Sequence, residues 1–345
     1  MYREIIAETT PIDNKNLPLE LIEGTGEVLH DTSASGRERP WGRHKMGNEK
    51  LFLLYEGARA RELVRVSDGR MIDLKECANE VVFNIGDDGR RKLARANFCR
   101  FRTCPMCCWR KSMKLYSQVS QITDTIMERE DGARFIFLTL TVRNVEGAEL
   151  RQKIERINKG WKYLTSKSQT FAPAKKLKAN LLGYLKALEI TYNRKQDTYH
   201  PHIHAILEVS PEYFASKNYI GRRAWAKLWA QAIKADYVPS VDVRAIDTTS
   251  KAVAEVAKYP VKMNSVLNIK NKAKAEEVLA TIHNATHNRR LLTFGGDMAK
   301  VKRQLVLDDI EKGDLLHVET DNEKGFNAVA QILFRYKAGR GVYVC

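Results

Sequence analysis

The chain has 345 residues, of which 43% are hydrophobic and 29% charged, a composition typical of a globular protein with two or three domains. No apolar run is long enough to cross a bilayer, and the first residues show no secretory signal, so we expect a cytoplasmic protein without a membrane partner. The net charge of +16 is spread along the chain and favours a partner rich in phosphate, although many basic proteins bind no nucleic acid.

Residues 1–70 are polar, and we interpret them as a partly loose N-terminal accessory arm. The next segment, 71–110, contains five of the six cysteines. Cys99, Cys104 and Cys107 have the spacing C-x4-C-x2-C, which in a cytoplasmic chain favours a metal site over disulfides.

Structural zinc is tetrahedral, so a fourth ligand is needed. Cys108 directly follows Cys107, and the two can hardly both bind one ion with good geometry. Cys77 is the better candidate, because it follows a short helical stretch and a hairpin-like segment over 80–96 returns the chain to Cys99. We therefore predict one structural zinc ion, with reduced, partly buried thiols as the alternative. The predicted ligands are Cys77, Cys99, Cys104 and Cys107.

The middle of the chain, 111–265, alternates between helical and strand patterns. The predicted elements are a helix over 111–130, a strand over 135–142, a helix over 147–166, strands over 185–192 and 202–207, a helix over 222–235 and a strand over 241–246. A short polar segment joins the two consecutive strands and predicts a hairpin. This order indicates an α+β fold, with a central, mainly antiparallel sheet flanked by helices.

The second strand of that hairpin contains His202 and His204. Because residues i and i+2 of a strand share a face, the two imidazoles lie side by side, which is half of a divalent metal site. The hairpin could bring Glu189 close to them as a third ligand. The alternative is a pair of histidines on an exposed sheet face. His200 could be a further ligand, a supporting residue or a residue that stiffens the loop with Pro201.

Residues 252–259 have helical composition, and Pro260 ends the pattern. Glu255 and Tyr259 are four residues apart and share a helix face. A tyrosine at the end of a helix is usually a packing residue, but near a metal site it can attack a phosphodiester.

The last part, 266–345, contains a helical pattern over 272–283, a basic stretch over 287–290 and two strand patterns over 314–318 and 329–336. It reads as a C-terminal accessory region for DNA binding or oligomerisation, which would allow a homodimer.

Four segments, in this order, resemble the plasmid rolling-circle replication initiators of Gram-positive bacteria, a branch of the HUH endonucleases. The resemblance covers about residues 71–300 and implies an HUH-type nuclease domain over 111–265. The matching segments are the cysteine segment 96–110, Phe-Leu-Thr-Leu-Thr at 137–141, Tyr-His-Pro-His-Ile-His at 199–204, and Glu-Val-Ala-Lys-Tyr-Pro-Val-Lys at 255–262.

The resemblance implies that the chain nicks one strand of plasmid origin DNA. The two strand histidines and Glu189 would hold Mn²⁺ or Mg²⁺, which polarises the scissile phosphate. Tyr259 would attack, leaving a 5′-phosphotyrosine and a free 3′-OH primer, while Lys258 or Lys262 would lower its pKa or orient the phosphate. Termination would follow by strand transfer or by hydrolysis assisted by Glu255. Host helicase and polymerase would be the further partners.

Three other functions fit part of the sequence. The pattern at 200–206 also matches histidine-triad nucleotide hydrolases loosely, but these use neither the cysteines nor Glu255 and Tyr259. An HUH-type transposase would share the chemistry. A zinc-containing DNA-binding module without enzymatic activity would explain the charge and the cysteines but would leave the histidine strand without a role.

Overall fold

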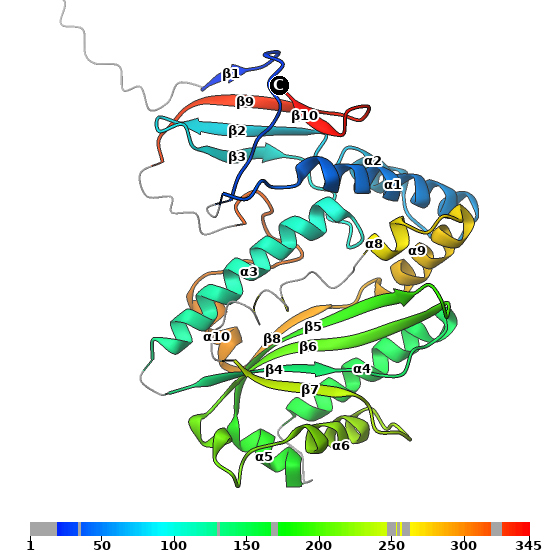
Figure 1. Ribbon diagram of the computed structural model, residues 1–345, viewed down its shortest axis with the longest axis vertical. Helices are drawn as coiled ribbons and strands as arrows, with labels where there is room; N and C mark the ends of the chain where they lie inside the picture. The colour runs from blue at the N-terminus through cyan, green and yellow to red at the C-terminus, as the bar shows by residue number, and fades with distance from the viewer. Residues whose placement is uncertain are drawn as a thin grey trace, which may run out of the picture.

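The computed structural model describes residues 19–33, 36–129, 132–166, 172–246, 253, 256, 263–318 and 326–345. Within these residues the fold is α+β, as predicted, with two five-stranded sheets that are largely antiparallel (Figure 1). One sheet is formed by strands within residues 20–96 and 328–344. The other sheet is formed by strands within residues 134–295. None of the described helices combines the length and the apolar character needed to span a membrane.

The central sheet has the strand order β7-β4-β6-β5-β8, and every neighbouring pair is antiparallel. The four strands predicted for the middle of the chain are confirmed, whereas the short edge strand β8 was not predicted. The strands are β4 (Arg134–Leu140), β5 (Leu181–Asn193), β6 (Thr198–Val209), β7 (Val241–Ile246) and β8 (Leu292–Gly295). The β5–β6 hairpin is the longest pair and forms the centre of the layer.

Helices cover both faces of this sheet (Figure 1). On one face, Ile203 and Ala205 are buried beneath α4 (Leu150–Thr165) and α6 (Arg222–Ala232), and Trp229 donates a hydrogen bond to the Thr141 carbonyl at 2.8 Å. On the other face, Phe137 and Ile206 pack in an apolar cluster with side chains of α3 (Pro105–Met127) and α10 (Gly296–Gln304). Helix α5 (Ala172–Asn180) precedes β5, and α9 (Lys272–Thr286) precedes β8.

The terminal sheet has the order β1-β9-β2-β3, with β10 also paired to β9. Its strands are β1 (Glu20–Ile22), β2 (Glu80–Gly86), β3 (Arg91–Ala96), β9 (Ala328–Lys337) and β10 (Val342–Val344). Strand β1 runs parallel to β9, whereas β2 and β10 run antiparallel to it. The predicted hairpin before Cys99 is confirmed, and the two accessory regions, expected to be separate, share one sheet.

The prediction of a loose arm is wrong for residues 41–60, which form the 20-residue helix α1 (Trp41–Ala60). Leu51, Leu54, Tyr55 and Ala58 recur at helical spacing and are buried. A second helix, α2 (Asp68–Lys75), begins where the Ser67 hydroxyl accepts a hydrogen bond from the Arg70 N–H. Short elements complete the described chain: η2 (Gly147–Glu149), η3 (Pro211–Phe214) and α8 (Asn264–Leu267).

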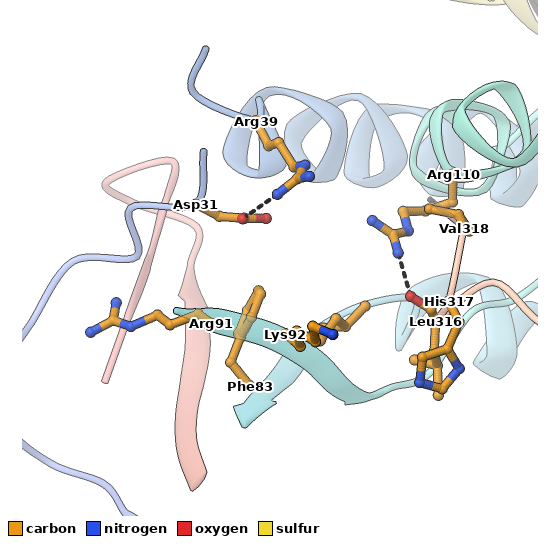
Figure 2. Close-up of a pocket in the computed structure, with 10 residues that line it drawn as sticks. Asp31, Arg39, Phe83, Arg91, Lys92, Arg110, Leu316, His317 and Val318 are labelled. Carbon is orange, nitrogen blue, oxygen red and sulfur yellow. Dashed lines mark hydrogen bonds and ion pairs between the residues drawn. The ribbon is translucent and has the colours of Figure 1, made fainter. Parts of the chain in front are cut away.

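The strand predicted over 314–318 is also wrong, because side chains hold this segment in an irregular path. The Asp314 carboxylate accepts hydrogen bonds from the N–H groups of Leu316 and His317 at 2.8 and 3.1 Å. Arg110 of α3 donates to the Leu315 carbonyl at 3.0 Å and to the Leu316 carbonyl at 2.7 Å, the second of these shown in Figure 2. Leu315 is therefore buried and Leu316 half-buried, although the described residues 314–318 form no strand.

Candidate metal centres

The register of the β5–β6 hairpin brings the predicted carboxylate and histidines together. Glu189 pairs with His202 and Ala187 pairs with His204, so alternation puts the three functional side chains on one face of the sheet. They lie on the face covered by α3 and α10, beside Phe137 and Ile206. Glu189 is 2% exposed and His202 is 8% exposed, whereas His204 is half-buried, so the group lies just under the surface with His204 at its open side.

The distances suit one bound cation. The Glu189 Oε2 atom lies 3.3 Å from His204 Nε2 and 3.7 Å from His202 Nε2. Ligand atoms that bind a cation at about 2.0–2.2 Å lie about 3–3.5 Å apart, depending on the coordination geometry. The described residues thus offer two imidazole nitrogens and one carboxylate oxygen to a common point.

Hydrogen bonds orient both rings with Nε2 toward Glu189. His202 Nδ1 lies 3.1 Å from the His200 carbonyl, which can only accept, so Nδ1 carries the proton and Nε2 keeps its lone pair. His204 Nδ1 lies 3.1 Å from the Thr139 hydroxyl. Such contacts hold metal-binding histidines in one tautomer. Thr139 was not predicted as part of the site, although its alternation with Phe137 in the first motif puts it on the same face.

His200 lies beside the group but outside it. Its ring stacks on that of His202 with the centroids 4.9 Å apart, and its main-chain oxygen is the acceptor for His202. Burial, followed by the neighbouring His202, lowers the pKa of His200 below its usual value. Three roles were considered for His200. These contacts agree with the role of a supporting residue that holds the ring of His202 in place.

The predicted catalytic residues Glu255, Tyr259 and Lys262 lie outside the described residues, as does Lys258. Two positions of the same predicted helix are described. Val253 and Val256 are helical and 1% exposed, and both belong to the apolar cluster on the face that carries the histidines.

The four predicted zinc ligands also come together. The Cys77 sulfur lies 3.7 Å from the sulfurs of Cys104 and Cys107, and the Cys99 sulfur lies 3.6 Å from that of Cys107. Zinc–sulfur bonds of about 2.3 Å at tetrahedral angles put sulfurs about 3.8 Å apart, whereas a disulfide needs about 2.05 Å. The buried cluster therefore has the geometry of a tetrathiolate metal site and not that of disulfides.

The surroundings of these sulfurs suit deprotonated thiols. The main-chain N–H of Arg100 donates to Cys107 Sγ at 3.2 Å, and Asn48 Nδ2 donates to Cys104 Sγ at 3.4 Å. The buried Lys45 ammonium donates to the Cys77 carbonyl at 2.9 Å, which brings a positive charge to the thiolates. Asn48 and Lys45 belong to α1, in the region expected to be loose, so the sequence reasoning missed them.

Cys108 is not part of the cluster, in agreement with the argument from its position. Its thiol donates to the Arg102 carbonyl at 3.1 Å, and burial raises its pKa well above the usual value. This cysteine therefore stays a neutral thiol.

Comparisons with known proteins agree with the predicted resemblance. A family model described as "Replication protein" matches residues 90–344. A Protein rep of Streptococcus pneumoniae serotype 2 is 35% identical over 321 residues, which covers 90% of this chain and 95% of the relative. A Protein rep of Bacillus amyloliquefaciens is 34% identical over 344 residues, covering 93% and 98%, and one of Lactiplantibacillus plantarum is 36% identical over 306 residues, covering 85% and 90%. No solved structure matches the chain significantly.

The chain belongs to the replication protein family, as its resemblance to plasmid replication initiators of Gram-positive bacteria predicts.

Proposed function

We propose that this replication protein is a metal-dependent nickase that starts rolling-circle replication of a plasmid by cutting one strand of the origin. The observation that carries the proposal is the buried group of Glu189, His202 and His204 on one face of the central antiparallel sheet. Neither a zinc-containing DNA-binding module nor general phosphate binding needs such a group. In this proposal residues 111–265 form an HUH-type nuclease domain.

The residues of the group suit a hard divalent cation, Mn²⁺ or Mg²⁺, with some of its positions left to water and phosphate oxygen. Once bound, the cation would withdraw charge from the scissile phosphate. In its neutral form His202 offers its Nε2 lone pair, since its Nδ1 donates to the His200 carbonyl, and His204 turns its Nε2 toward Glu189 while its Nδ1 contacts the Thr139 hydroxyl. A histidine nucleophile, as in the histidine-triad hydrolases, would not need a carboxylate 3.3 Å from the ring nitrogen.

The proposed nucleophile is Tyr259. Its oxygen bonds to the scissile phosphorus while the bond from phosphorus to the 3′-oxygen breaks, so the products are a 5′-phosphotyrosine and a 3′-OH primer. Val256, three positions before Tyr259, supports this, because it is helical and buried in the apolar cluster on the histidine face. Lys262 orients the phosphate, and Glu255 activates the water that releases the DNA unless a second subunit takes the strand.

The cysteine cluster is proposed to hold one structural zinc ion. The further partners in this proposal are the plasmid origin, single-stranded at the nick, and the host helicase and polymerase in the cytoplasm.

The nicking proposal is tested by incubating the protein with labelled single-stranded oligonucleotides. Together these cover the whole plasmid that encodes the chain, and covalent attachment of the protein to any of them is measured. With Mn²⁺ we expect a protein–DNA adduct for the wild type and none for Tyr259→Phe, because the only proposed nucleophile is lost. His202→Ala should also abolish the adduct, whereas the exposed His30→Ala should not. Glu255→Ala should still attach but release DNA about 10²–10⁴-fold more slowly, the usual contribution of a general base.

Each variant should keep the circular dichroism spectrum of the wild type. An adduct formed by Tyr259→Phe would move the nucleophile elsewhere, and full metal-dependent nicking by His202→Ala would remove the metal site from the mechanism.

A further inference from the structure

Two adjoining cavities lie outside both metal centres and share Arg102 and Asn288 in their walls. The first, of about 320 Å³, lies between the loop that carries Arg100 and Arg102 and the ends of α2 and α9. The second, of about 570 Å³, lies between β8, α10 and the segment that follows α10. We call the two together the arginine groove.

The lining of the groove is strongly basic. The first cavity is lined by Arg65, Arg70, Arg100 and Arg102, and no carboxylate appears among the described residues around it. The second has six cationic side chains against two carboxylates, those of Asp309 and Glu311. The cationic residues of the second cavity are Arg102, Arg289, Arg290, Lys302, Arg303 and Lys312.

Ion pairs take up only part of this charge, those of Arg70 with Asp73, Arg102 with Glu311 and Arg289 with Glu155. Arg65, Arg290 and Arg303 are exposed, and none of them has an ion pair with another residue that the structure describes. In the pocket of Figure 2, Arg39 is paired with Asp31 and Arg91 with Glu27, so ion pairs take up two of its four Arg and Lys side chains. The arginine groove is therefore the better place for an outside anion.

Two arginines of the groove are held in position by the main chain. Arg100 donates to the Gly313 carbonyl at 2.7 Å, and Arg102 donates to the Thr286 carbonyl at 2.5 Å. Both lie between Cys99 and Cys104, so the cysteine cluster anchors the loop that carries them. A fixed guanidinium loses little freedom when it binds a phosphate oxygen.

The lining of the first cavity favours contacts to a backbone over stacking of bases. Tyr55 and Phe101 are buried at 0% and 6% exposure, and the guanidinium of Arg70 lies 4.5 Å above the Phe101 ring. Single-strand sites usually present open aromatic rings on which bases stack, whereas duplex binding rests chiefly on contacts from cations to phosphates.

The second cavity also lies beside the candidate metal centre. Leu292 and Phe294, which line it, pair with Ala187 and Leu185 of β5, and Ala187 pairs with His204 of β6. Cross-strand partners share a face, so the groove opens on the face that carries the histidines.

We propose that the arginine groove binds the phosphate backbone of the double-stranded DNA that flanks the nick site. The inference rests on the proposed function for its biological meaning, but the groove can be tested without any cleavage. Duplex held there would direct the unpaired strand toward His202 and His204.

The test compares two double variants in binding a short, labelled duplex of arbitrary sequence over a range of salt. Arg290→Ala with Arg303→Ala should weaken binding about tenfold or more, and it should lower the slope of log affinity against log salt by about 2, since each lost phosphate contact lowers the slope by about 1. The matched control is Arg222→Ala with Arg223→Ala, which removes two exposed charges at the start of α6. The control should keep the wild-type slope.

Equal losses in the two double variants would mean that net charge and not the groove binds DNA, and the proposal would fail. It would also fail if the groove variant lost affinity for single strands only. The groove variant keeps Glu189, His202 and His204, so it should still attach to a short single strand. If neither it nor the wild type attaches, the proposed function fails while the duplex result stands.

Discussion

At the scale of single residues, Lys186 is an ionisable group that the candidate functions do not use. It lies on the face of β5 opposite Glu189, is 4% exposed, and donates to the Asn158 side-chain oxygen of α4 at 2.5 Å. Burial lowers its pKa to about 8. The folded protein thus binds this proton less tightly than the unfolded chain does.

The consequence is a stability that rises with pH. From about pH 8 to the unfolded value of 10.5, the unfolded chain keeps the proton and the folded chain does not, so deprotonation favours folding. Below about pH 8 Lys186 is protonated in both states, and its buried charge lowers the free energy of unfolding by its full amount. The size of the pKa shift puts this amount at up to about 3 kcal/mol.

Lys186→Met removes this penalty and should stabilise the fold at pH 7 by about 1–2 kcal/mol, after the loss of the hydrogen bond to Asn158. Denaturant unfolding at neutral and at alkaline pH measures the gain, which should shrink as the pH approaches the unfolded pKa. Lys162→Met, at an exposed position of α4, is the control and should change little. A gain that does not depend on pH would contradict the assignment.

At the scale of elements, the cysteine cluster joins three segments that follow one another along the chain. Cys77 follows α2, Cys99 follows β3, and Cys104 and Cys107 lie at the start of α3. Without a cation, four buried sulfurs less than 4 Å from a neighbouring sulfur could not all be ionised.

Metal binding should therefore be coupled to folding of residues 71–110. We expect about one zinc per chain from the count of four ligands, and chelation should lower the melting temperature. Cys99→Ser should lose the metal, whereas Cys108→Ser should keep it, because Cys108 only donates to a carbonyl. Elemental analysis and thermal unfolding provide the readouts. A metal-free protein with unchanged melting temperature would leave four buried thiols as the correct interpretation.

At the scale of the whole molecule, the terminal sheet pairs strands from near the two ends of the described chain. Strand β9 lies between β1 and β2, so residues near both ends and the hairpin before Cys99 unfold together if β9 detaches. Phe334 is 0% exposed and packs edge-to-face on Phe83, with the ring centroids 6.1 Å apart.

Phe334→Ala should destabilise the protein by about 3–5 kcal/mol, the usual cost of deleting a buried aromatic ring. Because β2 and β3 lead directly to Cys99, the variant should also release zinc at a lower denaturant concentration. Val329→Ala, on the same strand but 50% exposed, is the matched control and should have a small effect. Unfolding of the variant without early zinc release would show that the sheet and the cluster are energetically separate.

The sequence by itself determined the features that depend on near neighbours. A period of two identified β6 and β7, a continuous apolar run identified β4, and a short polar loop made β5 and β6 a hairpin. The hairpin register then follows from local geometry, so Glu189 could be placed opposite the histidines before any tertiary contact was known. The spacing of the cysteines identified their cluster for the same reason.

Only the tertiary structure decided which distant segments meet. The pairing of β9 with β2, the packing of Lys45 and Asn48 beside the cysteines, and the arginine groove between α9 and α10 join residues that are far apart in the chain. A local pattern records which side of an element is apolar, but it does not record the partner that covers that side. The strand pattern at 314–318 was misleading for this reason, because Leu315 is buried beside Arg110 and pairs with no strand that the structure describes.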